Sequence, residues 1–160
     1  MDDAGKTCIT KKCCPIRGFM LPSLAVFAVI FVFQYLWHGV LLKPMYEATA
    51  SVWRPMAQMN HFCFIFVIRD LATAFIITCL YCWVSNAKLA DGKYCPVSMG
   101  MRFGVKIGLL LGVTCLGLYV VLPIPKEMAL AWFAGDIVMG LLIGLVLCCC
   151  DRMKGGKDIA

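Results

Sequence analysis

The residues of this sequence most able to do chemistry are ionisable side chains inside long apolar runs. Arg69 and Asp70 lie in one such run, and Asp136 lies in another. A charge at the centre of a membrane helix costs about 2.5 to 3.5 kcal/mol, so each needs a partner or water. Counted from the outer ends of their runs, Arg69 and Asp136 lie at the same depth, about 12 Å below the outer membrane surface. We therefore expect these two side chains to meet, directly or through one water, whereas Asp70 points about 100° away around the helix.

Other polar residues reach a similar depth and extend this pair to a cluster. Gln34 and His38 are four residues apart, which places them on one face of a helix. The predicted cluster lies in the outer half of the bundle and comprises Gln34, His38, Arg69, Asp70, Tyr119 and Asp136. Two interpretations remain open: a neutral Arg–Asp pair that fixes how the helices align, or a site for a proton, an ion or a small ligand.

Two histidines could hold a haem between neighbouring helices. His38 and His61 lie at about the same level, and paired histidines are axial ligands of b-type haem. Both lie near the membrane surface rather than deep in the bundle, which favours an interfacial or hydrogen-bonded role. We therefore expect no cofactor and keep haem as a less favoured alternative.

Eleven cysteines form the other set of reactive side chains. Cys79 and Cys82 have the spacing of a redox pair, but that spacing also arises on any helix face. The run Cys148, Cys149 and Cys150 ends the last apolar segment. Small apolar filler is the favoured interpretation, and acylation, soft-metal binding and thiol redox chemistry are the alternatives.

The elements that carry these residues are membrane spans. Of 160 residues, 62% are hydrophobic and 15% charged, and the mean hydropathy is +0.86. The apolar residues fall in four runs, each long enough to cross a bilayer, at residues 19–42, 62–84, 103–122 and 128–150. The sequence thus predicts an all-α, integral-membrane four-helix bundle, with residues 1–160 as one domain, and excludes a nucleic-acid-binding module.

Basic residues predict the orientation of the spans. Eleven Lys and Arg residues lie on the side of both termini and three on the other side, which places both termini in the cytoplasm and makes anionic lipid the expected partner of the charge. The outer connection from Lys43 to Asn60 carries aromatic residues and prolines. We expect a short amphipathic helix there, from about Tyr46 to Trp53, at the membrane surface.

Glycines predict how the last two spans pack. The third run carries Gly100, Gly104, Gly108 and Gly112 at every fourth position, and the fourth run carries Gly140 and Gly144. Small residues let membrane helices approach closely. We favour a tight contact within the chain between these two spans over a homo-oligomer interface.

Several motifs resemble small four-helix bacterial inner-membrane proteins whose domain has no assigned function. They are the stretch from His38 to Glu47, the Val52-Trp-Arg-Pro segment, and the turn at Leu122 that runs into residues 129–135. This resemblance implies a bacterial inner-membrane location and the same four-span layout, and it carries no catalytic residues.

Three functions compete. No nucleotide loop, metal-protease helix or catalytic triad is present, which makes an enzyme the less favoured class. The first hypothesis is an accessory or structural subunit of a membrane assembly, with membrane-protein partners or further copies of itself. The second is a small carrier or sensor that uses the outer polar cluster, and the third is a haem or thiol redox protein.

Overall fold

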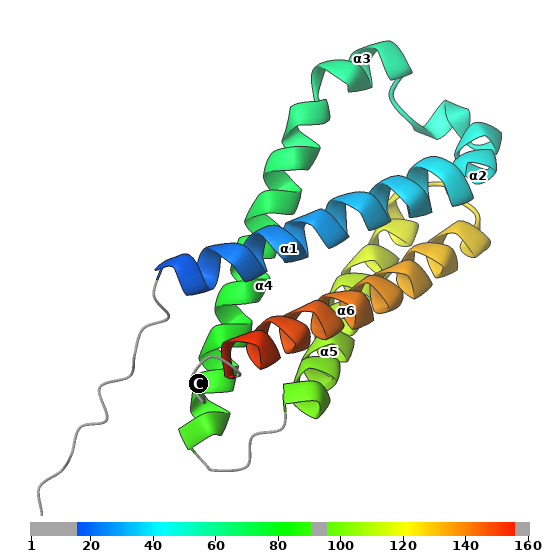
Figure 1. Cartoon of the computed structure of the whole chain (residues 1–160). Coiled ribbons are helices and arrows are strands. Elements are labelled where there is room, and N and C mark those ends of the chain that lie inside the picture. The colour runs from blue at the N-terminus through cyan, green and yellow to red at the C-terminus, as the bar shows by residue number, and fades with distance from the viewer. Residues whose placement is uncertain (1–15, 91–95, 156–160) are drawn as a thin grey trace, which may run out of the picture.

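Every regular element in the computed structural model is helical in the two stretches that it describes, residues 16–90 and 96–155 (Figure 1). Four helices are long and apolar enough to span a membrane, which confirms the all-helical, four-span prediction. The long helices are α1 (Ile16–Gln34), α4 (Cys63–Ala90), α5 (Pro96–Val121) and α6 (Lys126–Gly155). The span within α5 begins at Val97 rather than at Phe103, because proline is well suited to the first turn of a helix and Pro96 starts α5 upstream of Arg102.

The first connection is built from short helices. A π-helical stretch, Tyr35–Leu41, continues α1 and is followed by α2 (Lys43–Ala48), a 3-10 turn (Ala50–Val52) and α3 (Met56–His61). The expected helix from Tyr46 to Trp53 thus begins earlier and ends at Ala48. Thr49 marks this end, since its hydroxyl donates to the Met45 carbonyl at 2.8 Å and accepts from the Trp53 indole at 2.9 Å. We call the end of the bundle that carries α2, α3 and the α5–α6 turn the loop end.

Six glycines lie in the contact between α5 and α6: Gly100, Gly104, Gly108, Gly112, Gly140 and Gly144. A Cβ atom added at Gly100 would stand 2.6 Å from the Gly144 carbonyl oxygen, and one at Gly108 would stand 2.7 Å from the Asp136 carbonyl oxygen. Real Cβ atoms do not approach other atoms this closely. The two backbones therefore pack against each other at a distance that only glycine permits.

Helix α6 is the centre of the bundle. Half of its membrane span is buried, against 22% of each of the other three spans. The main core gathers apolar side chains from all four long helices: Val26, Ile30, Ala74, Ile77, Tyr81, Ile107, Met139, Ile143 and Leu147. At the end opposite the loops, the Tyr81 hydroxyl donates to Asp151 Oδ2 at 2.8 Å and thereby joins α4 to α6.

Toward the loop end, α4 separates from α5 and α6 (Figure 1). Every residue from 61 to 69 is exposed, whereas Asp70 is buried and begins the packed part of the helix. An amphipathic span would show one buried face over these positions. The first two turns of α4 thus lie apart from α5 and α6 and bury no face within the described structure.

Candidate functional site

The site begins at the π-helical end of α1, which is fastened to α6 by Trp37. The Trp37 indole lies directly over Gly135, where any side chain would collide with it, and its N–H donates to the Ala131 carbonyl at 3.2 Å. A π-helix has more residues per turn than an α-helix, so it changes the direction of the side chains that follow. His38 lies within this π-helical stretch, immediately after Trp37.

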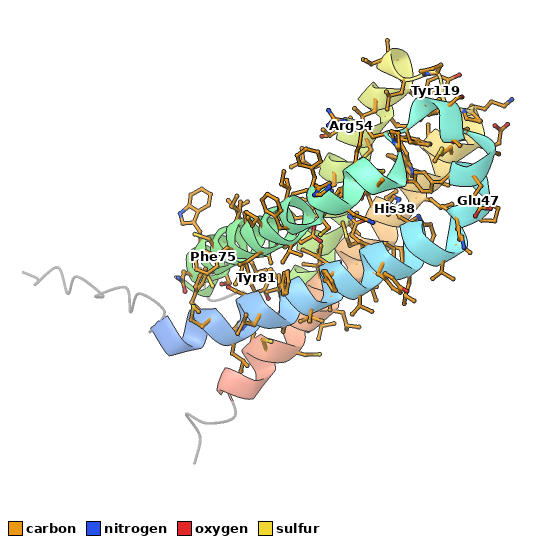
Figure 2. The ribbon with its side chains drawn as sticks, turned by 90° about the horizontal axis from the view of Figure 1, so that it is seen from above. His38, Glu47, Arg54, Phe75, Tyr81 and Tyr119 are labelled. Carbon is orange, nitrogen blue, oxygen red and sulfur yellow. The ribbon has the colours of Figure 1, made fainter. Side chains whose placement is uncertain are left out.

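His38 is held by Tyr46 of α2. Its Nδ1 atom and the Tyr46 hydroxyl form a hydrogen bond of 2.7 Å. Burial raises the pKa of the Tyr46 phenol to about 12, so the phenol keeps its proton at neutral pH. Figure 2 shows His38 and Glu47 at the loop end of the ribbon, far from Phe75 and Tyr81 toward the other end.

Four rings pack together at the loop end, and we call them the aromatic cap: His38, Tyr46, Trp53 and Trp132. Their centroids lie between 5.3 and 6.4 Å apart, the normal range for packed aromatic pairs. Trp132 stands one helical turn before Asp136 on α6, so the two side chains share a face. The aromatic cap therefore lies between the loops and Asp136.

Arg69 pairs with its neighbour Asp70. Both Nε and Nη2 of the guanidinium donate to Asp70 Oδ1, at 2.9 and 2.7 Å. No ion pair between Arg69 and Asp136 exists within 4.0 Å in the described structure, so the direct contact expected from the sequence is not formed. The reason is the flexible arginine side chain, which bends around the helix to reach the adjacent carboxylate and packs its guanidinium over the Phe66 ring at 5.2 Å.

Asp136 retains an unsatisfied carboxylate oxygen. Its Oδ2 atom is covered from solvent and has no hydrogen-bond partner among the described residues. The Cys115 thiol of α5 and the Arg69 guanidinium of α4 are both near enough to interact with this carboxylate electrostatically. A buried polar atom without a partner costs about 1 to 3 kcal/mol. Among the described residues, Asp136 is thus the acidic side chain that has a solvent-covered oxygen without a partner.

The structure brings together part of the predicted cluster. Arg69 lies near enough to act electrostatically on both His38 and Asp136. Half-buried Gln34 and exposed Tyr119 form no hydrogen bond in the part of the chain that is described. Figure 2 places Tyr119 near the loop end of α5.

Cys115, Tyr46 and the three tryptophans of the site, Trp37, Trp53 and Trp132, were not predicted from the sequence as members of it. Cys115 follows Gly108 and Gly112 at helical spacing, so its position on the α6-facing side of α5 was a usable signal. Tyr46 offered a weaker signal, because its contact with His38 depends on the π-helical turn between them.

The remaining candidates stay apart from this site. His61 is the exposed last residue of α3, and no contact joins it to His38 among the described residues. Cys79 and Cys149 are exposed, Cys82 is half-buried, and Cys148 and Cys150 are buried. No disulfide joins any two of these five, and no group of three or more metal-ligating side chains forms in the described stretches.

Comparisons of the chain with protein families, with curated proteins and with solved structures found no match.

Proposed function

We propose that this protein is a small membrane-embedded carrier or sensor that binds a proton or a small cation at Asp136. The observation that supports this function best is the buried Oδ2 atom of Asp136, which lacks a partner in the described structure. A purely structural ion pair would use Arg69 to neutralise Asp136. Arg69 is instead engaged by Asp70, so the carboxylate of Asp136 is left for a group that enters from elsewhere.

The surroundings of Asp136 favour a small, positively charged or proton-donating ligand. An ionised carboxylate can only accept hydrogen bonds. A partner for its free oxygen must therefore supply a proton, an N–H, an O–H or a cation. Asp136 has the α5 backbone on one side, at the glycine contact, and the aromatic cap toward the loop end. Both restrict the space for a ligand, so we expect a small one. Intramembrane carboxylates in such settings commonly serve ion and proton pathways.

Asp136→Asn tests the proposal through the fluorescence of nearby Trp132. We expect the wild-type protein in nanodiscs to show a transition in tryptophan emission during a pH titration or a Na⁺ titration at constant pH, because charge changes on Asp136 act on an indole one turn away. Asn keeps the side-chain shape but cannot ionise, so the variant should lose the transition while keeping its helical circular dichroism.

Glu127→Gln is the matched control, since Glu127 is an exposed carboxylate at the start of the same helix. It should titrate like the wild type. A transition that persists unchanged in Asp136→Asn, or a wild-type protein without any transition, would contradict the carrier or sensor function.

A second candidate is an accessory subunit of a membrane assembly. The observation in its favour is the loop-end start of α4, where residues 63–69 are all exposed in the described structure. The glycine repeats at Gly100–Gly112 and at Gly140 and Gly144 already pack α5 against α6, so we expect a partner to use α4 instead. The same titration separates the two functions, because a subunit with a structural role needs no titratable Asp136.

We further propose that the protein resides in a bacterial inner membrane with both termini in the cytoplasm. Basic residues are concentrated beyond the ends of the spans that lie opposite the loop end. A phosphatase reporter that is active only after export should therefore be silent when fused after Ala160 and active when inserted after Pro125. The reverse pattern would invert the orientation.

A further inference from the structure

A groove at the loop end lies apart from Asp136. It has a volume of about 430 Å³ and is formed where the first connection meets the start of α4. Its lining residues are Trp53, Arg54, Met59, Phe62, Ile65 and Phe66. Five of these six are apolar or aromatic, so the groove has a single charged group.

That charge is not neutralised within the described chain. Among the other basic residues at this end, Lys43 lies 3.8 Å from Glu47, Lys126 lies 4.0 Å from Glu127, and Arg69 pairs with Asp70. Arg54 has no carboxylate within 4.0 Å in the described residues. Its guanidinium instead stands over the Phe62 ring, 5.7 Å from the centroid, which orients the cation without satisfying its N–H donors.

The groove is positively charged at one end and apolar along the rest of its length. Arg54 precedes α3 and belongs to the connection, whereas Ile65 and Phe66 belong to the membrane span that begins at Cys63. The positive group is thus at the level of lipid headgroups, and the apolar walls continue into the level of acyl chains. A phospholipid has this same order of chemistry along its length.

We propose that this groove binds one anionic phospholipid, with the phosphate at Arg54 and an acyl chain along Phe62, Ile65 and Phe66. The guanidinium forms charge-assisted, forked hydrogen bonds with the phosphate oxygens. The acyl chain covers apolar side chains that this chain leaves exposed. This site goes beyond the proposed function, because it takes a different ligand at a different charged residue, although Trp53 belongs both to the groove and to the aromatic cap.

Native mass spectrometry of the full chain, released from detergent after exposure to defined lipids, tests the site. The probes are phosphatidylglycerol, phosphatidylcholine of the same acyl chains, and inorganic phosphate. We expect one phosphatidylglycerol to be retained in preference to phosphatidylcholine. Arg54→Gln should reduce that retention about fivefold, the change expected from losing one basic residue at an anionic membrane surface.

Two further variants make the result specific. Lys43→Gln removes a cation from the same end of the bundle that already has an acidic neighbour, and it should leave retention unchanged. Arg54→Lys keeps the charge without the fork and should fall between the wild type and Arg54→Gln. Circular dichroism establishes that each variant is folded.

Three outcomes would overturn the proposal. Equal retention of phosphatidylglycerol and phosphatidylcholine would show that the negative charge of the headgroup does not contribute to binding. Unchanged retention in Arg54→Gln would show that the lipid lies elsewhere or that a partner helix covers the groove. Displacement of phosphatidylglycerol by inorganic phosphate would mean that the groove takes a free anion. Asp136→Asn should not alter lipid retention, so this test fails or succeeds independently of the carrier or sensor function.

Discussion

Gly104→Leu is expected to break the bundle apart at its tightest contact. A Cβ atom at this position would collide with the backbone carbonyl oxygen of Gly140 and lie 3.1 Å from the Gly144 Cα atom. These are backbone atoms, which cannot rotate away as the end of a side chain can. We expect a loss of about 3 kcal/mol or more in the free energy of unfolding, at the upper end of overpacking effects. Thermal unfolding in detergent, followed by circular dichroism, measures it.

Gly117→Leu on the same helix is the matched control. No atom lies within 4 Å of a Cβ atom built at Gly117, so the same substitution there adds only exposed apolar surface. It should unfold close to the wild-type temperature. Equal destabilisation by the two variants would show that the α5–α6 contact does not account for the effect.

The Arg69–Asp70 pair provides the second large effect. Asp70 is 4% exposed and its carboxylate depends on the guanidinium beside it. Arg69→Ala leaves this carboxylate buried and unpaired, and we expect a cost of about 3 kcal/mol, near the lower end for broken buried pairs because Arg69 itself is half exposed. Asp70→Ala strands the arginine beside apolar side chains and should cost a similar amount.

A double-mutant cycle measures the coupling between these two charges. Arg69→Ala with Asp70→Ala should be less destabilised than the sum of the two single variants, since neither charge is then left alone. The same cycle between Arg69 and Asp136 is expected to show a smaller coupling, because no direct ion pair joins them. Additive effects in the first cycle would show that Arg69 and Asp70 are not energetically coupled.

The features that follow from periodicity along one helix were predictable from the sequence. The four spans follow from runs of apolar residues, and the position of Gly104 in a helix contact follows from its four-residue repeat. Both depend on regular geometry, which any α-helix shares.

The features that depend on departures from that regularity were not predictable. The separation of α4 from the α5–α6 pair determines where Arg69 finds its partner, and no spacing in the sequence encodes that separation. The hydrogen bond between His38 and Tyr46 needs a π-helical stretch, which changes the register of one turn. A long, flexible side chain can also reach more than one partner, and Arg69 pairs with the adjacent Asp70.

The order of synthesis gives the local Arg69–Asp70 pair a consequence for biogenesis. The ribosome makes α4 before α6, so a charge pair between these helices could form only after the last span had left the translocon. Arg69 would until then have to be accommodated in lipid alone, at the cost of an isolated intramembrane charge. Because its counterion is the next residue, α4 carries a neutralised pair from the moment it enters the bilayer. The helix can therefore partition stably while it waits for the α5–α6 hairpin that completes the bundle.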